Sequence, residues 1–424
     1  MSFISLLKKE YDIKDKTLEL FEKAEKEVLP QFEKISQIAA QNQLKVMRAF
    51  STHHVSEQHL GATSGYGYDD VGRDTLDEIY ADVFGAEAAL VRHNFVSGTH
   101  ALASCFYGVL RPGDKMIYVT GGPYDTLEEV IGIRGEEGNG SLRDFGIDYG
   151  EVSLKEDGEP DFEAIKNAID DKTKLVVMQR SKGYEWRKSI FVEKIGEIVK
   201  CVKKVKPDCI CMVDNCYGEF VETKEPTQVG ADLIAGSLIK NPGGGLALTG
   251  GYIAGRRDLI EKISYRLTSP GIGAEVGASL NMNRNMYQGF FLAPHIVGES
   301  IKTAILAAKM LELAGFSVCP ASNEERTDII QAVKLLEEER LCRFCQGIQA
   351  GSPVDSHVTP MPWDMPGYEN QVIMAAGTFV SGASIEISAD APIKEPYIGY
   401  LQGGLTYESG KIAVIKAIDN IIDC

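Results

Sequence analysis

Residues 209–215 read CICMVDN and residues 233–245 read LIAGSLIKNPGGG, and these two stretches decide the fold. Each contains a short, continuous apolar run that leads to a charged residue, Asp214 in the first and Lys240 in the second. Continuous apolar runs of this length are typical of strands that are buried on both faces of a parallel sheet. The segment between Asp214 and Lys240 leaves room for one helix and one strand, so both stretches are predicted to be strands of an α/β layer.

The same pattern continues on both sides of these stretches. Further apolar runs lie at residues 88–95, 115–120, 174–180 and 250–255, and helical patterns at residues 98–110 and 191–205 separate several of them. This alternation predicts a mostly parallel sheet of about seven strands, covered by helices, over residues 61–290.

The flanking segments have other patterns. Residues 16–48 carry apolar side chains at helical spacing, which predicts a helical arm within residues 1–60 that Pro30 kinks or breaks. A long helix is predicted from Ile296 to Leu313, and residues 291–424 have the pattern of a smaller α+β domain. The loop at residues 351–370 contains Trp363 and Tyr368, and it could form a lid over a substrate or simply pack against the domain.

Composition limits the classes of function. The chain has 424 residues and a formal net charge of −17, from 61 acidic against 44 basic residues. This surplus argues against nucleic acid or an anionic membrane as the main partner, but it allows a small anionic ligand in a local basic pocket. The nine cysteines are scattered, and no apolar run approaches the length of a membrane span. With no signal-peptide pattern at the N-terminus, we expect a cytoplasmic protein.

Three motifs carry the chemistry. Residues 97–100 (SGTH) follow a predicted strand and form the start of a helix. The N–H groups of such a turn can bind a phosphate group. The alternative is that the turn is only a helix cap. Asp214 ends a strand where ligands bind in open α/β sheets, although it could instead be a capping residue. Lys240 meets a glycine-rich turn without the GxxxxGK[ST] pattern of a nucleoside-triphosphate loop, and an ordinary surface lysine is the alternative.

Together these motifs fit pyridoxal 5'-phosphate (PLP) as the cofactor. A lysine forms a Schiff base with its aldehyde, a carboxylate keeps its pyridine nitrogen protonated so that the ring withdraws electrons, and a helix N-terminus holds its phosphate. No metal site is predicted. His53, His54 and His59 lie close in sequence, but adjacent histidines point to different sides of an element, and Cys342-x-x-Cys345 has no partner pair at zinc spacing.

Longer blocks of sequence resemble a known family. The blocks YDDVGRDT (68–75), SGTHA (97–101), GGPYDTL (121–127) and SLIKNPGG (237–244) are similar to those of fold-type I PLP enzymes of the cystathionine/methionine γ-lyase group. The blocks QRSKGYEWRKS (179–189), VDNCYGEF (213–220) and SHVTPMPWDMPGYE (356–369) resemble its methionine γ-lyase-like branch, the aluminium-resistance proteins. The resemblance covers nearly the whole chain. It implies an aspartate aminotransferase-like fold and a homodimer or homotetramer with shared active sites.

The resemblance also implies roles for individual residues. Lys240 corresponds to the Schiff-base lysine and Asp214 to the partner of the pyridine nitrogen. The residues that correspond to phosphate ligands are Ser97, Gly98, Thr99 and Ser237, together with Tyr68, which would reach the phosphate of the neighbouring subunit. The group's cross-subunit arginine, two residues after Tyr68, is Asp70 here, and Arg73 is the candidate replacement.

The sequence departs from the group around the cofactor ring. The tyrosine that stacks on the ring corresponds to Thr120, so the nearest aromatic residue, Tyr124, is assigned this role, with His100 as another candidate. The asparagine that contacts the ring hydroxyl has no clear counterpart, and Ser181 is the candidate.

The implied reaction is β- or γ-elimination from a sulfur-containing amino acid such as cystathionine or methionine. Lys240 would take the Cα proton, and loss of the sulfur group would give a thiol, ammonia and a keto acid. The substrate carboxylate normally needs an arginine, for which Arg180 and Arg187 are candidates and Lys394 a weaker one. For each of the three, a structural ion pair is the alternative.

Two other functions stay open. The sequence matches the lyase group only weakly at the positions that contact the cofactor ring and the substrate carboxylate. It would therefore also suit another fold-type I PLP enzyme, an aminotransferase or a decarboxylase. The resemblance to the aluminium-resistance branch also leaves open a function in metal tolerance without lyase activity. Transamination requires a keto acid acceptor, whereas elimination does not, and titration with aluminium or zinc tests for metal binding.

Overall fold

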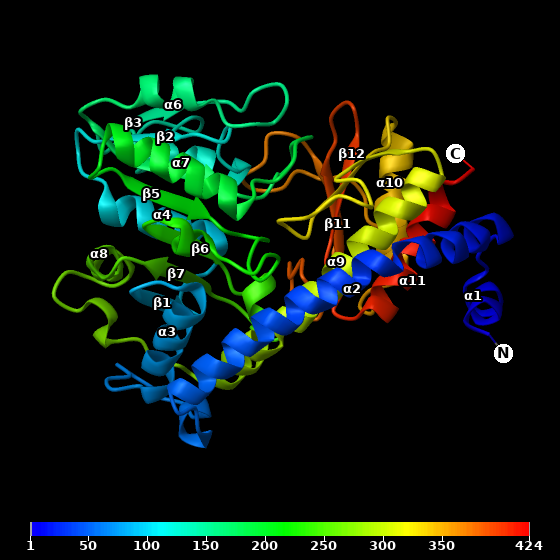
Figure 1. Cartoon of the computed structure of the whole chain (residues 1–424), viewed down its shortest axis with the longest axis horizontal. Coiled ribbons are helices and arrows are strands. Elements are labelled where there is room, and N and C mark those ends of the chain that lie inside the picture. The colour runs from blue at the N-terminus through cyan, green and yellow to red at the C-terminus, as the bar shows by residue number, and fades with distance from the viewer. Residues whose placement is uncertain (1, 424) are drawn as a thin grey trace.

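The computed structural model describes residues 2–423 and contains two β-sheets joined by two long helices (Figure 1). Helices α2 (Asp15–Thr52) and α9 (Asn283–Leu313) pack side by side and run from the large sheet to the small one. Helix α1 (Phe3–Tyr11) precedes them at the N-terminal end.

The large sheet has seven strands in the order β1-β7-β6-β5-β4-β2-β3. Only β7 runs antiparallel to its neighbours, so the predicted mostly parallel sheet is confirmed. The strands are β1 (Ala88–Arg92), β2 (Lys115–Tyr118), β3 (Asp148–Glu151), β4 (Thr173–Gln179), β5 (Ile210–Asp214), β6 (Leu233–Ser237) and β7 (Gly251–Gly255). Strand β3 was not expected from the sequence because it is a polar, partly exposed edge strand without an apolar run.

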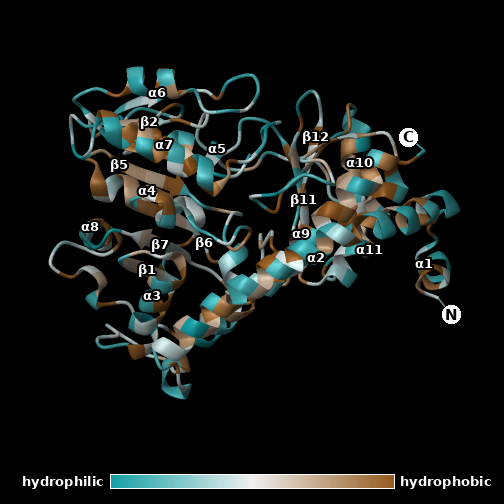
Figure 2. Ribbon diagram, in the orientation of Figure 1, coloured by the Kyte–Doolittle hydropathy of each residue, from teal (hydrophilic) through white to brown (hydrophobic). Residues whose placement is uncertain are grey.

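Both faces of this sheet are covered, because its strand residues alternate between two cores. Val176 and Met178 of β4 pack in the core that contains Ile195 of α7, whereas Leu175 and Val177 pack in the core that contains Phe106 of α4. The covering helices are α3 (Val71–Phe84), α4 (Gly98–Val109), α5 (Asp125–Ile131), α6 (Phe162–Ala168), α7 (Val192–Val205) and α8 (Arg257–Leu267). Figure 2 shows hydrophobic and hydrophilic residues alternating around α7 and α2, as expected for helices with one buried side.

The two long helices differ from the sequence predictions. Pro30 lies inside α2 without ending it, because the helix gains more from packing along α9 than it loses from one missing N–H donor. Helix α9 begins at Asn283 instead of Ile296, and Pro294 lies within it. It is the one helix among residues 2–423 long and apolar enough to cross a membrane, but 78% of its most apolar window is buried inside the protein, so it is a core helix.

The small sheet has five antiparallel strands in the order β10-β11-β12-β9-β8. They are β8 (Ser317–Cys319), β9 (Gln331–Lys334), β10 (Val372–Ala375), β11 (Ser388–Pro392) and β12 (Ile398–Gln402). Helices α10 (Glu338–Ala350) and α11 (Tyr407–Ile421) pack against each other beside this sheet. The remaining elements are short 3₁₀ turns, η1 (Glu57–Leu60), η2 (Pro226–Val229), η3 (Asn241–Gly243) and η4 (Gly273–Glu275).

Candidate active site

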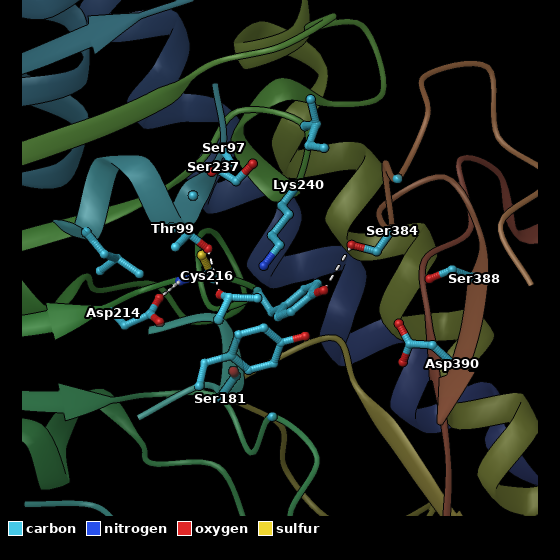
Figure 3. A pocket seen from close by; sticks show the side chains of 18 of the residues that line it. Ser97, Thr99, Ser181, Asp214, Cys216, Ser237, Lys240, Ser384, Ser388 and Asp390 are labelled. Carbon is cyan, nitrogen blue, oxygen red and sulfur yellow. Dashed lines mark hydrogen bonds between the residues drawn. The ribbon is translucent and has the colours of Figure 1, made fainter. Parts of the chain in front are cut away.

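A cavity of about 340 Å³ lies where the carboxyl ends of β4, β5 and β6 meet the N-terminus of α4 and the small sheet (Figure 3). Ligands of open α/β sheets bind at this edge because loops and helix N-termini converge there. The predicted site residues on its wall are Ser97, Gly98, Thr99, Tyr124, Ser181, Asp214, Ser237 and Lys240. The fold thus brings together residues that are far apart in the sequence.

One side of the cavity is the first turn of α4. Ser97 caps this helix, and its hydroxyl accepts a hydrogen bond from the N–H of His100 at 3.1 Å. A Cβ atom on Gly98 would lie 3.2 Å from Cβ of Ser237, so the helix and the end of β6 approach closely only because this residue is glycine. The unpaired N–H groups and the positive end of the helix dipole make this turn suited to a phosphate group.

Asp214 is the last residue of β5, and its carboxyl group is buried in the cavity wall. Its Oδ1 accepts a hydrogen bond from the N–H of Cys216 at 3.1 Å. Burial raises the pKa of Asp214, although the charge of Lys240 acts to lower it. A cation that binds against this carboxylate would therefore compensate an unfavourable buried charge.

Lys240 follows β6, and its side chain extends into the centre of the cavity (Figure 3). Its ammonium group lies 4.0 Å from the centroid of the Tyr217 ring. Burial acts to lower the pKa of Lys240, but the neighbouring Cys216, Tyr217 and Asp214 outweigh burial and raise it.

Tyr124 faces the cavity, as its predicted place beside a cofactor ring requires. Its hydroxyl shares a 2.9 Å hydrogen bond with that of Tyr368, which belongs to the proline-rich loop and also lines the cavity. Thr120 has a structural place instead, because its Oγ1 accepts from the N–H of Gln179 at 2.8 Å. The other stacking candidate, His100, lies off the wall with its ring against Phe95.

The predicted substrate arginines and lysine lie outside the cavity wall. Arg180 is fully buried and paired with Glu222 at 3.0 Å and Glu225 at 3.3 Å. Arg187 binds Glu185 at 2.7 Å, and Lys394 does not reach the wall. Two carboxylates pair with the Arg180 guanidinium, an arrangement that matches the structural ion pair given above as the alternative.

Tyr68 also lies away from the cavity of its own chain. Its side chain is 61% exposed, and its ring contacts Tyr66 at a centroid distance of 5.5 Å. Asp70 caps α3 by accepting from the N–H of Arg73, and the Arg73 guanidinium is buried on Asp74 and on backbone carbonyls. Arg73 is thus held by its own loop and by the backbone at Gly277.

Several residues on the wall were not expected from the sequence. Gln179, Cys216 and Tyr217 could have been found, because they lie at or just beyond the carboxyl ends of β4 and β5. Asp390 could not, because it comes from the small sheet, and no local pattern shows which strand of that sheet faces the cavity.

The other candidate sites have structural explanations. His53 lies 3.3 Å from Glu78 and 3.6 Å from Asp82, and residues 2–423 contain no group of three or more metal-binding side chains. Cys342 and Cys345 are both on α10, and the eight cysteines within the described range are free.

Comparison with known proteins establishes the family. The family model for methionine gamma-lyase matches residues 17–422. The chain belongs to the methionine gamma-lyase family. This family consists of PLP-dependent enzymes, and the match spans both sheets and the cavity between them.

Similar proteins place the chain within one branch of this family. A crystal structure of a carbon-sulfur lyase involved in aluminum resistance from Clostridium novyi is 54% identical, with a TM-score of 0.95 over 98% of each chain. The uncharacterized protein YnbB from Bacillus subtilis is 55% identical over 388 residues, 92% of each chain. The PLP-dependent protein YhfS from Escherichia coli is only 16% identical but has a TM-score of 0.59 over 91% of this chain and 96% of its own, which reflects the shared fold.

Proposed function

We propose that this protein is a PLP-dependent carbon–sulfur lyase that performs β- or γ-elimination on a sulfur-containing amino acid such as cystathionine or methionine. One observation carries the proposal: Lys240, Asp214 and the first turn of α4 line the same cavity. The donor set suits the cofactor, with an amine for its aldehyde, a buried carboxylate for its ring nitrogen and a helix N-terminus for its phosphate. Family membership supports the same assignment.

When bound, PLP supplies a carbonyl for the substrate amine and a ring that accepts electrons from Cα. The residues of the chain would then have separate tasks. Lys240 moves the proton at Cα, and Asp214 holds the proton on the ring nitrogen. Tyr124 would pack against the ring, and Ser181 would contact the ring hydroxyl. Ser97, Gly98, Thr99 and Ser237 would hold the phosphate.

We further propose that the active sites are shared between subunits of a homodimer or homotetramer. Tyr66 and Tyr68 are 74% and 61% exposed, an unusual position for two adjacent aromatic rings on a single chain. In the assembly, Tyr68 would contact the phosphate bound in the neighbouring subunit. The monomer would then lack one phosphate ligand.

The cytoplasm is the proposed location. The eight described cysteines are free and most of them are buried, which suits a reducing compartment in which the fold relies on its apolar cores.

The visible absorption spectrum tests the proposed cofactor attachment. Purified protein should be yellow and should retain the cofactor covalently after borohydride reduction, whereas a Lys240→Ala variant should not. A protein that stays colourless with added PLP would contradict the proposal.

The reaction is then tested by incubating the yellow protein with cystathionine, cysteine and methionine. Release of keto acid and ammonia without a keto acid acceptor is expected. Conversion that depends on an acceptor would identify an aminotransferase, and release of carbon dioxide would identify a decarboxylase.

A further inference from the structure

The charges on the cavity wall are unusual for a site that binds an ordinary amino acid. The ionisable acids and bases among its lining residues are Asp214, Lys240 and Asp390, apart from thiol and phenol groups. Carboxylate groups of ligands are typically bound by arginine, because its planar guanidinium forms two parallel hydrogen bonds. No arginine of the described chain lines this cavity, and a second carboxylate does.

Asp390 is the middle residue of β11, and its carboxyl group points into the cavity from the small sheet (Figure 3). The side chain is buried, and no ion pair forms with it among the described residues. Its Oδ1 accepts one hydrogen bond, from Nε2 of Gln402 at 3.3 Å. The orientation of the Gln402 amide is fixed because its Oε1 accepts from the Ser388 hydroxyl at 2.6 Å. The carboxylate is thus held in place without an ion pair, although the Tyr184 hydroxyl and the charge of Lys240 both act to lower its pKa.

Three tyrosine rings lie close enough to this carboxylate to interact with its charge. Tyr124, Tyr184 and Tyr368 pack together with centroid distances of 5.8–6.3 Å, and Tyr124 and Tyr368 line the cavity. Burial raises the pKa of all three hydroxyls, and the negative charge of Asp390 adds to this effect on each. The three phenols therefore lie within electrostatic reach of Asp390 and remain neutral.

This combination is selective for a cation. The faces of aromatic rings attract ammonium groups, and a fixed carboxylate adds a direct ion pair. A buried carboxylate without a counter-ion is unfavourable, so a ligand that brings a positive charge is favoured over one that brings none. Lys240 alone cannot compensate the negative charge of Asp390, because its single positive charge also interacts with Asp214.

We infer that Asp390, with the rings of Tyr124 and Tyr368, binds a second ammonium group at the far end of the substrate. This inference rests on the proposed lyase function and makes it more specific. The substrate class is an α-amino acid whose side chain carries an ammonium group beyond the sulfur atom; cystathionine carries such a group together with a carboxylate, and methionine carries neither. Asp390 is then a specificity-determining residue that contacts the substrate away from the bond that breaks.

A pair of substrates with nearly equal length and different charge tests this inference. S-(2-aminoethyl)-L-cysteine ends in an ammonium group, and S-propyl-L-cysteine ends in a methyl group at the same position. With PLP-loaded protein, we expect kcat/KM to be at least about tenfold higher for the aminoethyl compound, because a charged group in a desolvated site prefers its counter-charge strongly. Asp390→Asn should remove most of this preference.

Two further variants serve as controls. Asp390→Glu keeps the charge and should retain part of the preference. Asp171→Asn removes an exposed carboxylate outside the cavity wall and should leave the preference unchanged. Equal kcat/KM for the two compounds in the wild-type protein, or an unchanged preference in Asp390→Asn, would overturn the role of Asp390 while leaving the lyase function intact.

A binding measurement separates the two levels of the proposal. Each compound is titrated into the PLP-loaded protein, and the change in the visible absorption band gives an apparent dissociation constant. Tighter binding of the aminoethyl compound, lost in Asp390→Asn, supports the role of Asp390 even without turnover. Binding without release of keto acid would contradict the lyase function alone, and equal binding of both compounds would contradict the role of Asp390.

Discussion

Nη1 of Arg180 and Oε2 of Glu225 lie 3.3 Å apart in a part of the protein closed to solvent, with side-chain exposures of 0% and 3%. Arg180 also donates to Asn215, the residue next to Asp214, at 2.8 Å. This ion pair therefore supports the loop behind the cavity wall. We propose that Arg180 positions Asp214 and does not bind the substrate.

Replacing Arg180 with methionine should destabilise the protein by about 3–5 kcal/mol, because it leaves a buried carboxylate without its partner. Burial raises the pKa of Glu225 and Arg180 lowers it, so the variant should raise this pKa further. A carboxyl group whose pKa is raised in the folded state makes the protein less stable as pH rises. The destabilisation caused by Arg180→Met should therefore be larger at pH 8 than at pH 5. Urea denaturation at the two pH values measures this.

The matched control for this prediction is Lys188→Met. Lys188 is 64% exposed and pairs with Glu324 at the surface, so its loss should cost less than about 1 kcal/mol. A stable Arg180→Met protein with a raised KM alone would show instead that Arg180 binds the substrate carboxylate.

Asp214→Asn should retain PLP and lose activity. The amide keeps the size of the side chain but has no charge to hold the proton on the ring nitrogen, so we expect kcat to fall by roughly a hundredfold or more. The absorption spectrum reports PLP uptake, and keto acid release reports kcat. Asp214→Glu should recover part of the activity, and a kcat for the asparagine variant within threefold of wild type would exclude this role for Asp214.

Part of the candidate site could be predicted from local sequence patterns. Asp214 and Lys240 follow continuous apolar strands, and residues 97–100 combine a strand end with a helix start. Each of these signals is local, and the carboxyl ends of parallel strands meet at one edge of the sheet. Their convergence on one cavity therefore follows from the predicted topology alone.

Other parts depend on contacts between distant residues. Arg180 was a reasonable substrate ligand in sequence, and only the positions of Glu222 and Glu225 show that it is already paired. Asp390 lies in a strand without any motif, and it faces the cavity because the small sheet lies beside the cavity at the end of the large one. Pro30 is a similar case, since packing against α9 outweighs its local effect on the helix.

Gly98→Ala should weaken the binding of PLP. The added Cβ would lie 3.2 Å from Cβ of Ser237 and 3.5 Å from Sγ of Cys216, so the first turn of α4 must move away from the end of β6. Overpacking of this kind costs about 1–3 kcal/mol, and we expect roughly tenfold weaker uptake of the cofactor. Titration of the apoprotein with PLP, followed by absorption, measures the change.

Gly122→Ala is the control for this substitution. Its Cβ would come no closer than 3.4 Å to a neighbour, the flexible carboxylate end of Glu151. Cofactor affinity should therefore stay within about twofold of wild type. Equal losses in the two variants would mean that the close approach at Gly98 does not form the phosphate site.

Asp390 should make the apoprotein less stable as pH rises. Burial raises its pKa from an ordinary value of 3.8 to about 6, against the opposing effects of Gln402 and Lys240. The protein keeps its full stability below the pKa that Asp390 has in the unfolded state. As pH rises through about 6, the free energy of unfolding falls by up to about 3 kcal/mol. Asp390→Asn should therefore be more stable than wild type at pH 8 and similar to it at pH 4, as measured by urea denaturation. A variant that is less stable than wild type at pH 8 would contradict an uncompensated charge.

The proposed sharing of active sites predicts that two inactive variants restore activity when they are mixed. Lys240→Ala removes the lysine of one subunit, and a Tyr68→Ala variant removes the phosphate contact that this subunit offers to its neighbour. In a random mixture of dimers, about a quarter of the sites contain both native residues, because each mixed dimer has one intact site. Keto acid release after joint unfolding and refolding should approach this fraction of wild-type activity. Activity that remains at the mean of the two separate variants would show that Tyr68 acts within its own subunit or not at all.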